Sequence, residues 1–148
     1  MNNQSALTRL RNSSRALLAS SVAVLLPLFS TPGIAADKGE TLYQANCGGC
    51  HQATGQGLPG AFPPLAKSDF IAKNPMGLLD ITLKGLSGKL VVNGVEYNNT
   101  MPAMSHLSDG DLSAIITYVL NSWGNPGGKV STSQVAQARK AAGLEVKQ

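Results

Sequence analysis

Apolar residues recur at helical spacing most clearly between Ser108 and Trp123, in the stretch SDGDLSAIITYVLNSW. Five of them stand three or four positions apart and would share one face of a helix. These five are Leu112, Ile115, Ile116, Val119 and Leu120. Ser108 is the expected N-cap, with Asp111 at the capping-box position three residues later. The stretch therefore predicts an amphipathic helix that gives one face to a hydrophobic core.

Shorter helices are predicted in the middle of the chain. The stretch SDFIAK would form one that is capped by Ser68. The next would have Asn74 as its N-cap, Pro75 at its first position and Gly85 just beyond its end. Its inner face would consist of Leu78, Leu79, Thr82 and Leu83.

Two more helices are expected at the ends of the folded segment. Residues 37–47 would begin with Asp37 as N-cap and Glu40 as the partner in a capping box. Near the C-terminus, Ser131 and Gln134 have the same spacing and predict a last short helix.

A strand pattern occurs only around Asn93-Gly94, which valines flank on both sides. This pair predicts a tight hairpin with a type I′ turn. Residues 47–64 are dense in Gly and Pro and are expected to be loop. The predicted class is all-α, with much loop and one short hairpin.

The first 36 residues have the layout of a secretory signal. Three arginines precede an apolar run at residues 16–29, and small residues follow, with cleavage expected after Ala35 or Ala36. The alternative is an uncleaved membrane anchor, but 14 apolar residues are fewer than the roughly 20 that a spanning helix needs. We therefore expect residues 1–36 to be a signal peptide, 37–124 a folded domain in the periplasm, and 125–148 a C-terminal extension with a short helix.

Removal of the leader changes the charge of the chain. From residue 37 onward there are eight Lys and one Arg against eight acidic residues, a net charge of +1. No stripe of basic residues remains, which argues against nucleic-acid binding. The same segment has only six aromatic residues, so a bound cofactor would supply apolar mass that the side chains lack.

The chain's only two cysteines stand in CGGCHQ, at residues 47–52, and three kinds of site are possible. A disulfide over so short a loop would constrain little of the unfolded chain, and no βαβ context supports a redox pair. Structural zinc needs four tetrahedral ligands, usually as two pairs, but the adjacent Cys50 and His51 side chains would point apart, and His106 is the only other imidazole, so no second pair exists. The third kind, covalent haem c attachment, uses the C-x-x-C-H pattern that is present here. Cys47 and Cys50 would bind the porphyrin edge and His51 the iron.

A haem that transfers electrons needs a second axial ligand, commonly Met. Met76 is expected to pack in the core. Met101 precedes Pro102, which favours an extended backbone suited to aiming a ligand. Met104 follows three residues later, and spacing alone leaves both methionines as candidates. His106 is the other candidate, although we expect it to be a solvated loop residue.

In these features the chain resembles a class I c-type cytochrome over essentially the whole segment after the leader. GETLYQANCGGCH is similar to that family's first helix, whose Gly39 and Tyr43 positions pack against the family's last helix, here LSAIITYVLNSW. FPPL is similar to the segment whose proline carbonyl, here that of Pro63, accepts a hydrogen bond from the haem-binding histidine. YNNTMPAMSHLSD is similar to the family's Met-Pro loop, which implies that Met101 is the ligand.

Several stretches of the sequence are also similar to cytochrome domains fused to copper nitrite reductases and to cytochrome subunits of membrane dehydrogenases. The resemblance implies a small fold of helices around one covalent haem, with a short hairpin before the Met loop. It also implies a periplasmic one-electron carrier that is no enzyme and takes no small-molecule substrate. Its partners would be redox proteins: a reductase, dehydrogenase or oxidase. Residues expected to bury the ring are Leu65, Leu79, Val92, Tyr97 and those of the last helix.

Two alternatives of other kinds stay open. The chain could be a cytochrome subunit of a larger periplasmic reductase, dehydrogenase or oxidase complex. It could also be a small enzyme or gas sensor with an open haem site.

Overall fold

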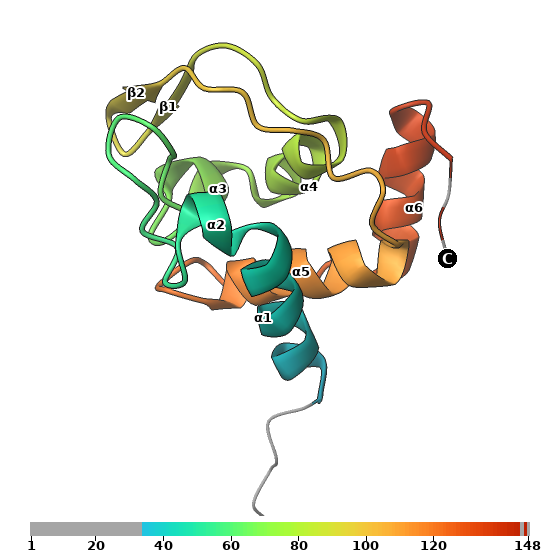
Figure 1. Cartoon of the computed structure of the whole chain (residues 1–148). Coiled ribbons are helices and arrows are strands. Elements are labelled where there is room, and N and C mark those ends of the chain that lie inside the picture. Colours follow the sequence, from blue (N-terminus) through green and yellow to red (C-terminus); the bar gives the residue numbers. More distant parts are fainter. Residues whose placement is uncertain (1–33, 146, 148) are drawn as a thin grey trace, which may run out of the picture. The chain divides into compact units, whose positions relative to one another are not determined.

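The computed structural model describes residues 34–145 and residue 147 (Figure 1). Most of the expected leader, residues 1–33, lies outside these described residues. None of the described helices has both the length and the apolar character needed to cross a membrane. The elements are α1 (Ile34–Asn46), α2 (Gly48–His51), α3 (Asp69–Lys73), α4 (Pro75–Lys84), β1 (Leu90–Val92), β2 (Val95–Tyr97), α5 (Asp109–Asn121) and α6 (Thr132–Ala141).

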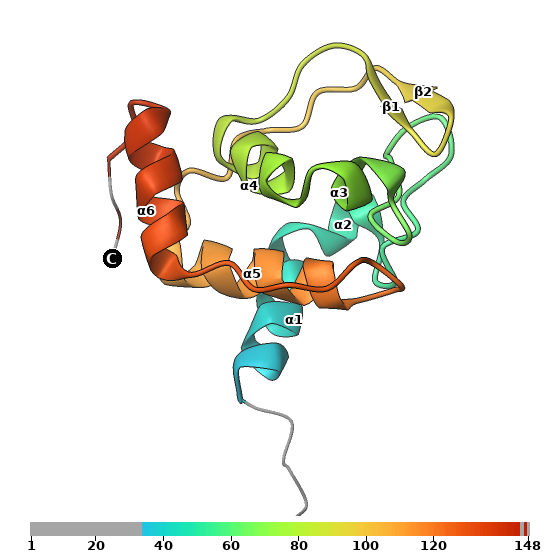
Figure 2. The ribbon, with the colours of Figure 1, turned by 180° about the vertical axis from the view of Figure 1, so that it is seen from behind.

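Helix α1 crosses α5 at close range, as both views of the ribbon show (Figure 1, Figure 2). A Cβ atom built on Gly39 would lie 2.5 Å from the carbonyl oxygen of Ala114 and 2.8 Å from Cβ of Tyr118. Because glycine has no Cβ, it lets the two backbones approach this closely. This confirms the predicted packing of Gly39 against the helix expected at LSAIITYVLNSW, which is α5.

Three aromatic rings pack together beside this crossing. The ring centroid of Tyr43 lies 5.6 Å from that of Tyr118 and 5.0 Å from that of Trp123. Tyr118 and Trp123 meet edge to face at 5.4 Å, a geometry that aromatic pairs favour. The cluster fixes the end of α1, from which the cysteine motif continues.

The start of α1 differs from the prediction. The helix begins at Ile34, so Asp37 lies inside it and the predicted N-cap and capping box with Glu40 are wrong. Ala35 and Ala36 are strong helix formers, and they allow the helix to begin before the polar residues that resemble a cap.

The caps predicted for α3 and α4 are confirmed. The Ser68 hydroxyl accepts a hydrogen bond from the Ile71 N–H, and the Asn74 side chain accepts one from the Gly77 N–H. Pro75 is the first residue of α4, and Gly85 ends the helix with a φ of +74°. The inner face of α4 is also as predicted, with Leu78, Leu79, Thr82 and Leu83 buried.

The two strands form the predicted antiparallel hairpin, with Leu90 opposite Tyr97. Asn93 and Gly94 have φ angles of 51° and 79°, the left-handed values that a type I′ turn requires. The turn is attached to α3, because Asn93 and Asp69 exchange two hydrogen bonds of 2.9 and 2.7 Å.

Helix α5 carries the predicted apolar face, and Ser108 accepts a hydrogen bond from the Asp111 N–H at its start. The capping box of Ser131 and Gln134 is present at α6. Val130 and Val135, both beyond residue 124, belong to the same core as α5. The described chain is thus mostly helical with one small hairpin, which confirms the predicted class. The core cluster is Tyr43, Ile71, Leu78, Leu79, Leu83, Leu112, Ile115, Ile116, Val119, Leu120, Val130 and Val135.

Candidate haem site

A large apolar cavity lies between α2, the loop that follows it, α4, the hairpin and α5. About 1120 Å³ of space that no protein atom occupies lies within it and at its mouth, and part of that space is open solvent. Ligand sites are commonly hollows of this kind, mostly apolar with a few polar groups in the wall. Its apolar wall includes Phe62, Leu65, Phe70, Leu78, Ile115 and Val119.

The cysteine motif forms one part of the cavity wall. The Cys47 N–H donates to the Tyr43 carbonyl, which continues the helical direction of α1 into the motif. The His51 N–H donates to the Cys47 carbonyl across the short helix α2. Cys47, Cys50 and His51 all reach the cavity, so the structure brings together the three residues that the motif predicts.

The two thiols differ in their surroundings. Cys50 is exposed, whereas Cys47 is half-buried, and both are free cysteines. Burial, with a smaller effect from Cys50, raises the pKa of the Cys47 thiol to about 11. Within the described part of the chain, no three His, Cys, Asp or Glu side chains gather as a metal site.

His51 is 8% exposed, and its ring is oriented by a single backbone oxygen. Its Nδ1 lies 2.9 Å from the carbonyl oxygen of Pro63, as the resemblance implies. A carbonyl can only accept, so Nδ1 carries the proton and Nε2 keeps a lone pair that can bind a metal. Burial lowers the pKa of His51, although the bond to Pro63 acts in the opposite direction. The ring is therefore favoured in the neutral form that metals bind.

The methionine loop forms another part of the wall. Met101 and Leu86 exchange two backbone hydrogen bonds of 2.9 Å each, and the Met104 N–H donates to the Thr82 carbonyl at 2.8 Å. Both methionines line the cavity. Met104 also packs against the hydrophobic core, whereas Met101 is not among the described residues that do so. The cavity wall alone therefore leaves both methionines as candidate ligands.

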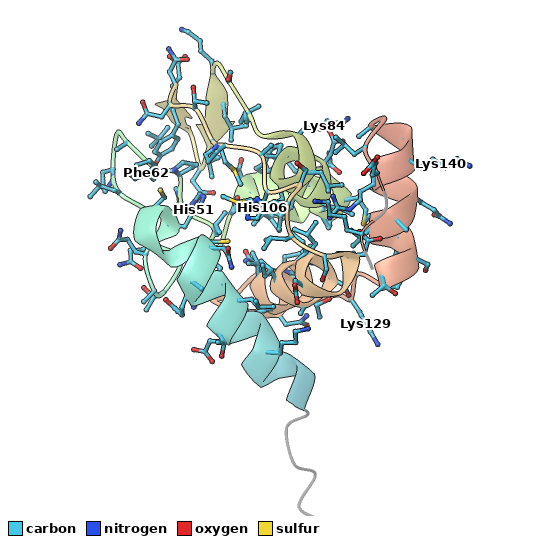
Figure 3. The ribbon with its side chains drawn as sticks, turned by 45° about the vertical axis from the view of Figure 1, so that its right-hand side comes forward. His51, Phe62, Lys84, His106, Lys129 and Lys140 are labelled. Carbon is cyan, nitrogen blue, oxygen red and sulfur yellow. The ribbon has the colours of Figure 1, made fainter. Side chains whose placement is uncertain are left out.

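The other candidate ligands lie elsewhere. Met76 is 43% exposed on α4, so its predicted core packing is wrong, because it lies on the face of the helix turned from the core. His106 is exposed, as expected, and lines a separate shallow hollow beside Arg139. Figure 3 shows His51 and Phe62 on the side of α2 and its loop, whereas Lys129 and Lys140 lie at the opposite side near α6.

Most residues expected to surround the ring do line the cavity. Leu65, Val92 and Tyr97 are in its wall. Leu79 is instead fully buried in the core, and the neighbouring Leu78 takes the place in the wall. The prediction for Leu79 is wrong because a one-residue shift turns a helical side chain by about 100°.

One buried ion pair, near the methionine loop, was not predicted from the sequence. Arg139 is fully buried and forms an ion pair with Asp109, which is 4% exposed. Arg139 follows Val135 by four positions, so it lies on the same face of α6 as that core residue. This spacing from a core residue is the sequence signal that could have predicted the burial of Arg139.

The donors and the apolar wall together fit a covalently attached haem. Two thiols and an oriented imidazole adjoin the same cavity, and a thioether sulfur adjoins it from another segment. Hydrocarbon side chains provide the apolar surroundings that a porphyrin requires.

Comparison with known proteins gives a consistent result. The cytochrome c family model matches residues 36–123. Cytochrome c-552 of Thermus thermophilus is 40% identical over 91 residues, 59% of this chain and 69% of that protein. The cytochrome c subunit of a quinone alcohol dehydrogenase from Gluconobacter oxydans is 32% identical over 105 residues, 68% of this chain and 22% of that protein. A fructose dehydrogenase cytochrome subunit from Gluconobacter japonicus is 33% identical over 116 residues, 73% of this chain and 23% of that protein.

Proposed function

Because this chain belongs to the cytochrome c family, we propose that it is a periplasmic one-electron carrier with His51 and Met101 as the axial ligands of its iron. Its cofactor is haem c, attached covalently through Cys47 and Cys50. When bound, the haem supplies an iron that cycles between Fe(III) and Fe(II). The observation that carries the proposal is one apolar cavity with His51 and a methionine loop both in its wall.

The protein's own residues hold this site in place. The Pro63 carbonyl fixes the orientation of the His51 ring, and such bonds also make an imidazole a better ligand. The two backbone hydrogen bonds with Leu86 fix both the N–H and the C=O of Met101. Side chains such as Ile115 exclude water from the cavity, and burial of this kind is one of the factors that set the potential of a haem.

A ligand at each axial position would leave no open site for chemistry, which favours a carrier over a catalyst. The visible spectrum of the oxidised protein tests this assignment. We expect a weak band at the red end from sulfur-to-iron charge transfer. The Met101→Ala variant should lose the band and Met104→Ala should keep it. The reverse result would move the ligand to Met104, and ready binding of carbon monoxide by the reduced wild type would refute the closed site.

A second candidate function is that of a cytochrome subunit in a larger complex. The specific observation is the similarity to the two dehydrogenase cytochrome subunits, each of which this chain matches over less than a quarter of its length. Purification from native membranes and periplasm distinguishes the two functions. Co-elution with a dehydrogenase, reductase or oxidase would favour the subunit, whereas a single haem protein alone would favour the free carrier.

Export and the domain division are part of the proposal. Residues 1–36 would be removed as a signal peptide, leaving residues 37–124 as the haem domain and 125–148 as its extension. The mass and N-terminal sequence of the protein from the periplasmic fraction test this. A chain that begins at Ala36 or Asp37 supports cleavage, and an intact chain in the membrane fraction supports an anchor.

A further inference from the structure

Arg139 of α6 donates from all three of its guanidinium nitrogens. Nε donates to a carboxylate oxygen of Asp109, Nη1 to the Ser105 carbonyl at 2.8 Å, and Nη2 to the Leu107 carbonyl. Asp109 is the first residue of α5. The next residue of α6, Lys140, points into solvent (Figure 3). Of the two basic residues of α6, Arg139 is therefore the one that is buried against the rest of the fold.

Burying a guanidinium is unfavourable unless its donors are satisfied, and here each nitrogen has a partner. Two of these partners are backbone carbonyls in one short loop, which the flat fork of arginine can hold together. The residue lies beyond residue 123, where the family match ends. The C-terminal segment of this chain therefore supplies an attachment for a loop that belongs to the haem domain.

The loop in question continues directly from the methionines. It is attached to Leu86 at Met101 and to Thr82 at Met104. The Leu107 N–H then donates to the Met104 carbonyl at 3.1 Å, which closes a turn. Arg139 holds the carbonyls at both ends of residues 105–107, so it fixes the C-terminal side of the loop. Without it, the backbone bonds of the methionines to Leu86 and Thr82 would remain, together with the bond of 2.7 Å from the Asp109 N–H to the Lys147 carbonyl just beyond the loop.

We propose that Arg139 is a positioning residue that keeps the methionine loop closed over the haem site and so keeps the sulfur of Met101 on the iron. The inference rests on the proposed function, in which Met101 is the sixth ligand. Arg139 is not in the wall of the haem cavity, and it acts through the Ser105 and Leu107 carbonyls.

Competition by free imidazole measures how firmly the loop holds its ligand. The oxidised, haem-loaded protein is titrated with imidazole, and the loss of the red charge-transfer band gives the apparent affinity. In Arg139→Met the apolar replacement fills similar volume without donors. We expect imidazole to bind this variant roughly tenfold more tightly than the wild type, or more, because charge-assisted hydrogen bonds to the loop are lost. Arg139→Lys keeps the charge without the fork and should give a smaller increase.

Val135→Ala is the matched control. Val135 is fully buried on the same face of α6, so its truncation weakens the packing of the helix without removing a donor to the loop. We expect imidazole affinity in this variant to equal that of the wild type even though the protein is less stable.

The outcomes separate this inference from the proposed function. If the wild type shows the red band but Arg139→Met and Arg139→Lys bind imidazole no more tightly than Val135→Ala, Arg139 has only a structural role and the inference is wrong. If the wild type itself lacks the band, the proposed ligand set fails, and the inference fails with it.

Discussion

The close crossing of α1 and α5 makes a sharp prediction for Gly39→Ala. The new Cβ would lie 2.5 Å from the Ala114 oxygen and 2.8 Å from Tyr118 Cβ, whereas ordinary contacts begin at 3.4 Å. Both neighbours are fixed to the backbone of α5 and cannot swing aside. The two helices would have to separate by about 0.9 Å at this point, the difference between the first distance and an ordinary contact.

The size of the effect follows from two opposing contributions. Overpacking of this kind costs about 1–3 kcal/mol. Replacing glycine by alanine inside a helix returns up to about 1 kcal/mol through backbone propensity. Since two immobile atoms are in the way, we take the upper end of the first range and expect a net loss of about 2 kcal/mol in the free energy of unfolding.

A second glycine serves as the control. Gly110 is in the first turn of α5, and its nearest neighbour to a new Cβ is the Ser108 hydroxyl at 3.8 Å, an ordinary contact. Gly110→Ala therefore tests helix propensity without the clash. It should leave stability unchanged or raise it by up to about 1 kcal/mol.

Urea unfolding of the haem-loaded protein gives both values. The chain has one tryptophan, so its fluorescence reports on the region where α1 meets α5. The midpoint should fall for Gly39→Ala while the slope of the transition stays constant. A Gly39→Ala protein as stable as Gly110→Ala would refute the reasoning, because it would mean that the two helices can separate at no cost.

Three further predictions concern other parts of the molecule. Gly85→Ala should shift or abolish the red band, because a Cβ at Gly85 would lie 2.7 Å from the Met101 oxygen. Gly60→Ala controls for backbone strain, since Gly60 has a similar φ of +75° and a Cβ there would have no neighbouring atom within 4 Å. The hydrogen bond from Lys38 lowers the pKa of Asp111 in the folded protein. The ionised Asp111 therefore stabilises the fold at pH values above its ordinary pKa of 3.8, and this stabilisation is lost as the pH falls through the lower pKa of the folded state. Urea midpoints of the wild type and Asp111→Asn should therefore converge on acidification, and a constant difference would contradict this. Stopped-flow association with a redox partner should depend little on ionic strength, since residues 37–148 carry eight Lys and one Arg against eight acidic residues, and a steep salt dependence would be inconsistent with this.

The local features of the fold were predictable because their chemistry is local. Ser68, Asn74 and Ser108 cap their helices as expected, and Asn93-Gly94 turns the hairpin. In each case one side chain, or the φ angles of two adjacent residues, decides the geometry.

The errors arise where several options satisfy the same local pattern. The alanines before Asp37 fit both a cleavage site and a helix, and in the structure they continue α1 back to Ile34. In the ten-residue helix α4, the apolar pattern did not distinguish Leu78 from Leu79 as the residue in the cavity wall. Met76 was likewise expected in the core because it is apolar, although its helical position turns it outward.

The candidate site was predictable to the extent that it is contiguous in sequence. Cys47, Cys50 and His51 are neighbours in the chain, and the structure places all three at one cavity. The Pro63 carbonyl came only from family resemblance, because no single-sequence pattern pairs a histidine with an oxygen 12 residues away. Arg139 was missed for the same reason, since its partners lie about 30 residues earlier.

What these contacts share is that the parts of the site are held by backbone oxygens. Pro63 orients His51, Leu86 pairs with Met101, and Arg139 binds the carbonyls that follow the methionines. Groups fixed in this way need little rearrangement when a charge changes beside them. A carrier that gains and loses one electron requires such a site, whereas an enzyme that binds a substrate at the iron must free one ligand. In the proposed function, the attachment of the methionine loop from both sides therefore serves electron transfer by holding the sulfur of Met101 in place.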